Sequence, residues 1–158
     1  MVRCSKKTRE GWVLVDDMVR RWMQQRIQLT QDFENIAAPT ELEKSKVALV
    51  PRISAFCQTL VDYVSAGHFE IYDELITEAR EFDDGSLSTG LGLCKTIENS
   101  TDLALEFNDK YENSANFHER IHELPRDMVE LGSMLNFRFE LEDKLIATVH
   151  DCHRPLVA

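Results

Sequence analysis

Charged residues at positions that could perform chemistry lie on an apolar helix face near the C-terminal end of the chain. On a helical wheel of residues 125–150, Arg138 and Glu142 fall near the centre of a broad apolar face. The two are four residues apart, the spacing at which side chains of one helix meet. In residues 12–36, Arg26 likewise falls in the middle of an apolar stripe.

Charges on an apolar face must be paired and hydrogen-bonded, because burying an ion otherwise costs several kcal/mol. We therefore predict a polar cluster inside the protein that contains Arg26, Arg138 and Glu142 and extends to His68. Three roles are open for it: an ion-pair network that fixes the helix register, a pocket for a small anionic ligand, or a catalytic site. The first role needs the fewest additional assumptions.

Two histidine-containing segments could bind a metal ion. His118 and His122 are four residues apart and could chelate one if their segment is helical, with Glu119 and Glu123 beside them. The order HExxH is absent, so we expect solvated histidines. "HDCHRP", residues 150–155, gathers metal-binding residue types near the C-terminus, where we expect a frayed tail. We predict no metal site.

Other motifs of enzymes and cofactor-binding proteins are missing. The sequence has no phosphate-binding glycine loop, no serine elbow and no dinucleotide fingerprint. The four cysteines are far apart and form no CxxC, which gives no sign of a disulfide framework. We therefore predict a protein that is not an enzyme and needs no cofactor.

The hydrophobic pattern is helical almost throughout and predicts an all-α protein. We expect helices over residues 12–36, 41–67, 68–82, 93–112 and 125–150. Pro51 predicts a kink or short break near Val50. The helix over residues 68–82 either continues the one before it or leaves it at an angle, for which Gly67 is the natural place. We expect a loop over residues 83–92, "DDGSLSTGLG", and a looser connection over residues 113–120.

Four main helices with short connections predict an antiparallel up-down four-helix bundle with additional short helices. The chain has 158 residues, enough for one self-sufficient core, and shows no repeat or linker. We therefore expect one helical-bundle domain over residues 1–158.

The charge balance narrows the class of partner. The chain carries 28 acidic and 18 basic side chains, a formal charge of −10. This balance disfavours direct binding to nucleic acid and favours basic protein partners. The sequence has no signal peptide and no apolar run of the roughly 20 residues that span a bilayer. We therefore expect a cytoplasmic protein without a membrane partner.

A second candidate surface lies on the far side of the helix over residues 41–67. Its apolar face runs through Ile53, Phe56, Leu60 and Val64, and its opposite face holds Asp62, Ser65 and Ala66. If the helix continues past Gly67, that opposite face also holds Phe69, Asp73 and Ile76. An exposed aromatic ring beside small residues and carboxylates suits a partner helix with apolar and basic side chains. The alternative is that another helix of the same chain covers Phe69.

Three segments resemble one known family. "FCQTLVDYVSAGHFEIYDEL", residues 56–75, resembles the signature segment of the Rsd/AlgQ family, bacterial regulators that bind the primary sigma factor. "RWMQQR", residues 21–26, and "RFELEDKLI", residues 138–146, are similar to runs in the family's first and last helices. The segments follow the family's order. Between residues 83 and 126 the resemblance rests on length and helicity.

The resemblance implies a four-helix bundle that acts as an anti-sigma factor. Such proteins sequester the housekeeping sigma factor, mainly through its promoter-reading region 4, and so reduce its use by RNA polymerase. Asp62, Ser65 and Phe69 match the surface that the family uses. We assign Phe69 as the apolar anchor and Asp62 as the partner of a sigma arginine, with Ser65 and Ala66 allowing close approach. Asp73 completes this set, which we call the outward surface.

The resemblance also extends the polar cluster. The family's shared polar and aromatic set corresponds here to Trp22, Arg26, His68, Tyr72, Arg138 and Glu142, which we call the interior cluster. Arg20 stands where the family often has Asp, so a sigma contact by an acid there is lost or reversed. An alternative function is a small-ligand-sensing bundle built on Arg26, Arg138 and Glu142.

Some family members are also linked to a sugar-transport phosphocarrier and to alarmone-metabolising enzymes, and a contact with sigma region 2 is a further open alternative. No residue of this sequence selects among these partners.

Overall fold

The computed structural model describes residues 4–37 and 46–158, and within them it contains helices and no strand. The all-α prediction is therefore confirmed. The elements are α1 (Lys6–Ala37), α2 (Lys46–Ala66), the π-helix η2 (Gly67–Ile71), α3 (Tyr72–Phe82), α4 (Ser86–Glu98), α5 (Thr101–Tyr111), α6 (Ser114–Arg120), η3 (Ile121–Glu123), α7 (Leu124–Val149), η4 (Asp151–His153) and α8 (Arg154–Val157).

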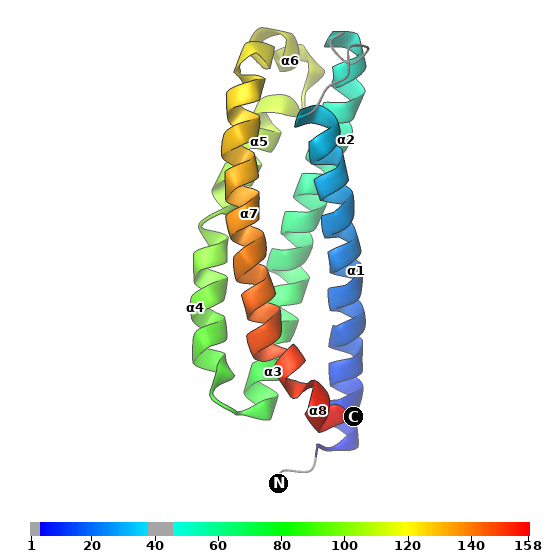
Figure 1. The fold of residues 1–158 in the computed structure, drawn as a ribbon, viewed down its shortest axis with the longest axis vertical. Coiled ribbons are helices and arrows are strands. Elements are labelled where there is room, and N and C mark those ends of the chain that lie inside the picture. Colours follow the sequence, from blue (N-terminus) through cyan, green and yellow to red (C-terminus); the bar gives the residue numbers. More distant parts are fainter. Residues whose placement is uncertain (1–3, 38–45) are drawn as a thin grey trace.

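The long helices stand side by side along the longest axis of the molecule (Figure 1). In this view α1 and α7 lie in front, α2 and α3 run behind them, and α4 and α5 lie on the left. α1 packs against α2, α4 against α7, and α2 against α5. α8 lies beside the beginning of α1. No helix among the described residues is both long and apolar enough to cross a membrane.

α1 forms because its apolar residues share one face and its first turn is capped. The Ser5 hydroxyl accepts a hydrogen bond from the Thr8 backbone N–H at 3.1 Å, which satisfies one of the free donors at the helix start. Trp12, Val19, Trp22 and Leu29 follow at helical spacing and are all buried. The expected helix over residues 12–36 therefore lies within α1.

α2 differs from expectation at Pro51, because the helix continues through this residue without the expected break. Proline has no backbone N–H, so the hydrogen bond to the carbonyl four residues earlier is missing. At Pro51 this bond is missing near the start of the helix, where its loss matters least. Burial of Ile53, Phe56 and Leu60 on the inner face outweighs it. The expected helix residues 41–45 lie outside the described residues.

A π-helical turn, η2, joins α2 to α3 at Gly67, where either a continued helix or a change of direction was expected. A π turn bonds residues five apart and so holds one residue more than an α-helical turn. Positions after it are therefore rotated relative to an uninterrupted α-helix. The rotation explains why Ile76 is only 9% exposed, although the helical wheel placed it on the outward side.

The expected loop over residues 83–92 is mostly wrong, because α4 begins at Ser86. The connection is short: Asp83 and Gly85 adopt left-handed backbone angles, and Asp84 accepts a hydrogen bond from the Ser86 N–H at 3.0 Å. Gly90 lets α4 approach its neighbours, since a Cβ there would lie 3.1 Å from Val149 and 3.2 Å from Ile76.

Two further connections also differ from expectation. The expected single helix over residues 93–112 is divided into α4 and α5 by a turn at Asn99 and Ser100, and the Ser100 hydroxyl bonds back to the Ile97 carbonyl. Residues 113–120, expected to be irregular, contain the helix α6. Residues 125–150 form most of α7, as expected.

The C-terminal segment is ordered against the rest of the fold, so the expectation of a frayed tail is wrong. His150 and His153 are each 1% exposed, and the Trp12 indole N–H donates to the His150 carbonyl at 3.1 Å. Stacking of Trp12 on His150 and of Phe82 on His153 holds η4 in place. His118 and His122, in contrast, are exposed, as expected.

Gly67→Ala tests whether η2 depends on a close approach. A Cβ at Gly67 would lie 3.0 Å from Trp22 and from the Tyr72 hydroxyl, both of which are buried. Because such overpacking typically costs about 1 to 3 kcal/mol, we expect Gly67→Ala to lower the free energy of unfolding in urea. The matched control is Gly92→Ala in α4, where nothing lies within 4 Å of the new Cβ. The control should gain up to about 1 kcal/mol, and equal gains in both variants would contradict the packing argument.

Candidate functional site

Arg138 on α7 is fully buried, and every nitrogen of its guanidinium group has a partner. Its Nε lies 3.3 Å from the Glu142 carboxylate, and its Nη2 donates to the Tyr72 hydroxyl at 2.9 Å. Its Nη1 donates to the hydroxyls of Ser100 at 3.1 Å and Thr101 at 3.0 Å. The residue therefore connects α7 to α3 and to the beginning of α5.

Glu142 accepts hydrogen bonds on both carboxylate oxygens from two tyrosines. The hydroxyls of Tyr63 and Tyr72 donate to it at 2.6 and 2.7 Å, and Arg26 Nη2 lies 3.4 Å from it. Each tyrosine hydroxyl also accepts from an arginine: Tyr63 from Arg26 at 3.0 Å, and Tyr72 from Arg138. Two parallel chains from arginine through tyrosine to carboxylate therefore converge on Glu142.

The protonation states in these chains follow from burial. Desolvation raises the pKa of Glu142, and Arg138, the two tyrosine hydroxyls and Arg26 act in the opposite direction. Desolvation and the neighbouring carboxylate raise the pKa of Tyr63 and of Tyr72 well above the usual value. Both tyrosines therefore remain neutral hydrogen-bond donors to Glu142.

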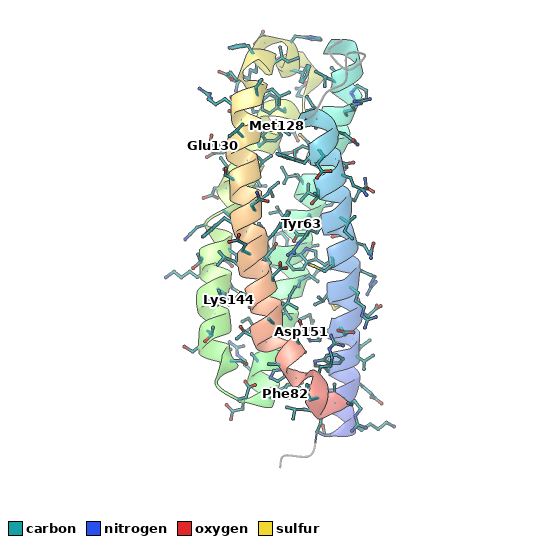
Figure 2. All side chains as sticks on the ribbon, in the orientation of Figure 1. Tyr63, Phe82, Met128, Glu130, Lys144 and Asp151 are labelled. Atoms are coloured by element: carbon teal, nitrogen blue, oxygen red, sulfur yellow. The ribbon has the colours of Figure 1, made fainter. Side chains whose placement is uncertain are left out.

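Aromatic rings cover the cluster on the α1 side. Trp22 stacks on Tyr63 with ring centroids 5.0 Å apart and meets Tyr72 edge-on at 5.8 Å. Its indole N–H donates to the Tyr63 carbonyl at 3.2 Å. The Arg26 guanidinium lies 4.6 Å from the Phe139 ring centroid. Tyr63 is fully buried at the middle of the molecule (Figure 2). Rings therefore exclude water from most of the ion pairs.

The structure brings five of the six residues of the interior cluster together: Trp22, Arg26, Tyr72, Arg138 and Glu142. His68 is the exception, and its assignment to the interior is wrong. Its side chain is 42% exposed and lies 3.6 Å from Glu98, because η2 turns Gly67 and Ile71 inward instead. The helical wheel missed Tyr63, which falls at the edge of the apolar face beside Phe56 but is fully buried.

The contacts of the interior cluster favour a structural role. Its buried donors and acceptors bond to one another, which leaves them no free group for a ligand. The prediction of a small-ligand sensor is therefore not favoured by these contacts. An internal network that connects five helices, α1, α2, α3, α5 and α7, can instead fix their register, because displacing one partner leaves a buried charge unpaired.

The outward surface lies on the side of α2, η2 and α3 that faces away from the interior cluster. Phe69 is 73% exposed, so no helix among the described residues covers it. Asp62 and Asp73 are exposed, and Ser65 and Ala66 are half-buried between them. The helical run from α2 through α3 thus carries an exposed aromatic ring, two exposed carboxylates and two small side chains.

One hollow is lined by Phe69, and a second lies nearby against η2. A groove of about 490 Å³ lies between α3 and α4, where Leu91 and Arg80 form part of its wall. A smaller hollow of about 170 Å³ lies between α1 and η2, lined by residues that include Met18 and Glu70. The groove between α3 and α4 gives a partner side chain room beside the Phe69 ring.

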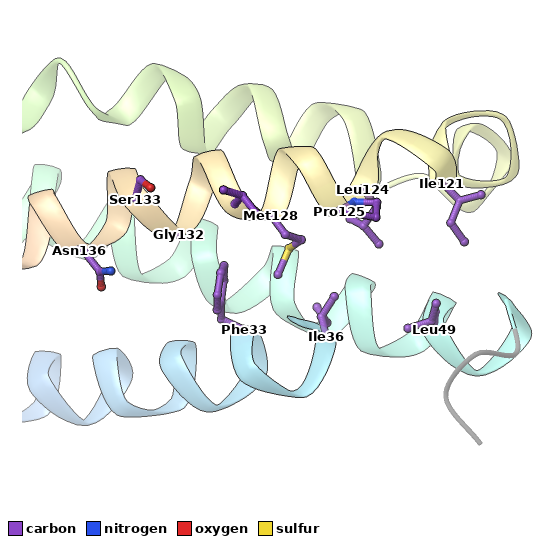
Figure 3. Close-up of a pocket in the computed structure, with 11 residues that line it drawn as sticks. Phe33, Ile36, Leu49, Ile121, Leu124, Pro125, Met128, Gly132, Ser133 and Asn136 are labelled. Carbon is purple, nitrogen blue, oxygen red and sulfur yellow. The ribbon is translucent and has the colours of Figure 1, made fainter. Parts of the chain in front are cut away.

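An apolar groove of about 690 Å³ lies elsewhere, at the α6 end of the molecule (Figure 3). Phe33 and Ile36 from α1 face Met128 from α7 across it. No residue pattern predicted this groove. None of its lining residues belongs to the outward surface or to the interior cluster.

Glu142→Gln tests the interior network. The substitution keeps the side-chain shape but leaves the fully buried Arg138 without a counter-ion. Since breaking a buried pair typically costs about 3 to 5 kcal/mol, we expect a loss of this size in the free energy of unfolding measured in urea. The matched control is Glu140→Gln, two positions away on the exposed side of α7, which should change it by less than about 0.5 kcal/mol. Equal stability of the two variants would contradict the proposed role.

The sequence is similar to that of one known protein family. Residues 1–150 match the family described as "Regulator of RNA polymerase sigma(70) subunit, Rsd/AlgQ". A protein named regulator of sigma D from Pectobacterium atrosepticum is 29% identical over 136 residues, which cover 85% of this chain and 88% of that protein. Proteins of the same name from Shigella boydii serotype 4 and Escherichia coli O139:H28 are each 31% identical over 138 residues, 87% of this chain and 86% of theirs. The chain therefore belongs to the Rsd/AlgQ family of regulators of the RNA polymerase sigma(70) subunit.

Proposed function

We propose that this protein is an anti-sigma factor that binds region 4 of the primary sigma factor through its outward surface. The observation that carries the proposal is Phe69, a large aromatic side chain that is 73% exposed within the segment most similar to the family. Exposed aromatic side chains on a helix are typical anchors of protein interfaces. The relatives named regulator of sigma D support the choice of partner.

The chemistry of the two surfaces is complementary. Region 4 is a helix-turn-helix module whose DNA-reading face is basic. The protein has a formal charge of −10, and Asp62 and Asp73 flank the aromatic anchor. In the proposed complex Phe69 inserts between apolar sigma side chains, and Asp62 pairs with a sigma arginine. Ser65 and Ala66 are small enough to let a sigma helix approach closely.

Sequestration follows from competition for one face. A region 4 held on the outward surface cannot contact promoter DNA or the core polymerase at the same time. Binding alone would therefore reduce the use of the sigma factor and regulate transcription, without catalysis and without a cofactor. The proposed site of action is the cytoplasm, where RNA polymerase works.

α1 contributes little to the proposed interface. Arg20, which stands where the family often has an acid, forms an ion pair with Asp16 at 3.0 Å on its own helix. Arg21 forms a similar pair with Asp17. Contacts with sigma region 2, a phosphocarrier or alarmone-metabolising enzymes stay predictions, because no feature of the outward surface selects these partners.

For the fold we propose the antiparallel up-down four-helix bundle with additional short helices. Its four columns would be α1, the run from α2 through α3, the pair α4 and α5, and α7. The arrangement is supported by the packing of α1 on α2 and of α4 on α7, and by the parallel alignment of their axes in Figure 1. Residues 1–158 would form this single domain.

Calorimetric titration with isolated sigma region 4 tests the interface. We expect one-to-one binding, and Phe69→Ala should weaken it by about 2 kcal/mol or more, roughly 30-fold in Kd. Thermal unfolding of the variant should be unchanged, because the side chain is exposed in the free protein. The matched control is Phe137→Ala on α7, a phenylalanine that is 52% exposed away from the outward surface. If Phe137→Ala weakened binding and Phe69→Ala did not, the interface would lie on α7.

Dependence on salt tests the electrostatic part. We expect the association rate with region 4 to fall as ionic strength rises, since an acidic protein attracts a basic partner over long range. Asp62→Asn should reduce both the rate and its salt dependence, because it removes one charge and keeps the side-chain shape. Stopped-flow measurements at several salt concentrations provide the comparison, with Asp109→Asn on α5 as the control. A rate that does not depend on salt would contradict electrostatic attraction.

A further inference from the structure

Three residues of types that bind metal ions lie close together at one end of the molecule. One belongs to the turn between α3 and α4, and the other two belong to η4 near the C-terminus. Asp84 in that turn lies beside Cys152 and His153 in η4, and one ligand atom of each lies within 4.8 Å of the other two. Figure 2 labels Phe82 and Asp151 in the same region. Neither the outward surface nor the interior cluster includes these residues.

His153 is already held in the orientation that a metal ligand needs. Its Nδ1 lies 2.9 Å from the Glu78 carboxylate, and its ring stacks on Phe82 at 3.8 Å between centroids. These contacts direct Nε2 toward Asp84, at 2.6 Å. Metal-binding histidines typically donate their second nitrogen to a carboxylate, which fixes the ring and raises its basicity. Glu78 has that position here.

The supporting residues are themselves fixed. Glu78 is 3% exposed, and its other oxygen lies 2.6 Å from His150 Nδ1. Asp84 uses Oδ1 to accept the Ser86 N–H at 3.0 Å, so that Oδ2 is the oxygen directed at His153. Asp84 and His153 therefore each have one polar side-chain atom held by the fold and a second one directed at the other residue.

We propose that Asp84, Cys152 and His153 bind a divalent transition-metal ion of the Zn²⁺ type. The ligands would be Asp84 Oδ2, Cys152 Sγ and His153 Nε2, with a water molecule in the fourth position. One sulfur, one nitrogen and one oxygen suit Zn²⁺ and disfavour Mg²⁺ and Ca²⁺, which require mostly oxygen ligands.

Small side-chain movements make the geometry suitable. Zinc-to-ligand distances of about 2.0 to 2.3 Å place tetrahedral ligand atoms roughly 3.3 to 3.8 Å apart. Asp84 and His153 must therefore separate by roughly 1 Å to admit the ion. The Asp84 side chain is 38% exposed and Cys152 is exposed, which gives this freedom and a path for entry.

Charge and protons balance on binding. The Cys152 thiol donates to the Thr148 carbonyl at 2.8 Å, and it would lose this proton to solvent when sulfur bonds to the metal. Coordination through His153 Nε2 requires the form of the ring that carries its proton on Nδ1, the nitrogen directed at Glu78. Burial and the charges of Asp84 and Glu78 raise the pKa of this thiol, and a bound cation reverses that effect.

The bound ion would join two parts of the chain that are far apart in sequence. It would link the turn between α3 and α4 to η4, across 69 residues from Asp84 to His153. Binding would therefore stabilise the attachment of the C-terminal segment to the bundle. This role is independent of sigma binding, because Asp62 and Phe69 are not involved.

Titration of the purified full-length protein, reduced and chelator-treated, with Zn²⁺ and with Co²⁺ tests the proposal. We expect one equivalent of Zn²⁺ to bind in calorimetry and to raise the Tm. Co²⁺ should give the near-ultraviolet charge-transfer absorption of a thiolate-cobalt bond. Cys152→Ser should abolish that absorption and weaken Zn²⁺ binding at least tenfold, and Asp84→Asn should weaken Zn²⁺ binding and keep the absorption.

Two control variants exclude other binding sites. Cys4→Ser removes the other cysteine that is not buried, and His118→Ala removes one of the exposed histidine pair. Neither should change the stoichiometry or the cobalt absorption. Circular dichroism of each variant verifies that it is folded. Absence of Zn²⁺ binding, binding unchanged in Cys152→Ser, or cobalt absorption lost in Cys4→Ser would each overturn the proposal.

Discussion

The fully buried pair Arg138 and Glu142 is the constraint on which the rest of the structure depends. Neither charge can reach water, so both need partners from other helices, and Tyr63, Tyr72 and Ser100 provide them. A shift of one helix relative to the others would break several of these bonds together. Apolar side chains alone tolerate such shifts at lower cost, because they pack without directional bonds.

The same constraint connects the interior to the exposed face. Tyr72 is the first residue of α3, and its hydroxyl donates a hydrogen bond to Glu142. It follows immediately after the π turn that contains Phe69. Gly67 packs against Trp22 and Tyr72 on the inside of that turn. The position of Phe69 is therefore set from within, by contacts that involve no part of the outward surface. A preformed surface of this kind loses little conformational entropy when a partner binds.

Much of this organisation could be predicted from residue patterns, and the failures have physical causes. Arg138 and Glu142 could be identified from the sequence because charged residues are not expected at the centre of an apolar helix face. The π turn left no such sign, and the wheel placed Ile76 outward for that reason. α4 is poor in strong helix formers and is stabilised by packing around Gly90, which local propensity does not reveal. His150 and His153 resembled a polar tail because their partners, Glu78 and Asp84, are distant in sequence.

Solution NMR of the isotope-labelled protein with unlabelled sigma region 4 tests the central claim most directly. Cross-saturation from the bound region 4 identifies the amides of this protein at the interface without any substitution. The account predicts that the strongest signal losses fall within residues 62–73, from the end of α2 to the beginning of α3. Losses concentrated on α7 or at the apolar groove beside α6, with residues 62–73 unchanged, would contradict it.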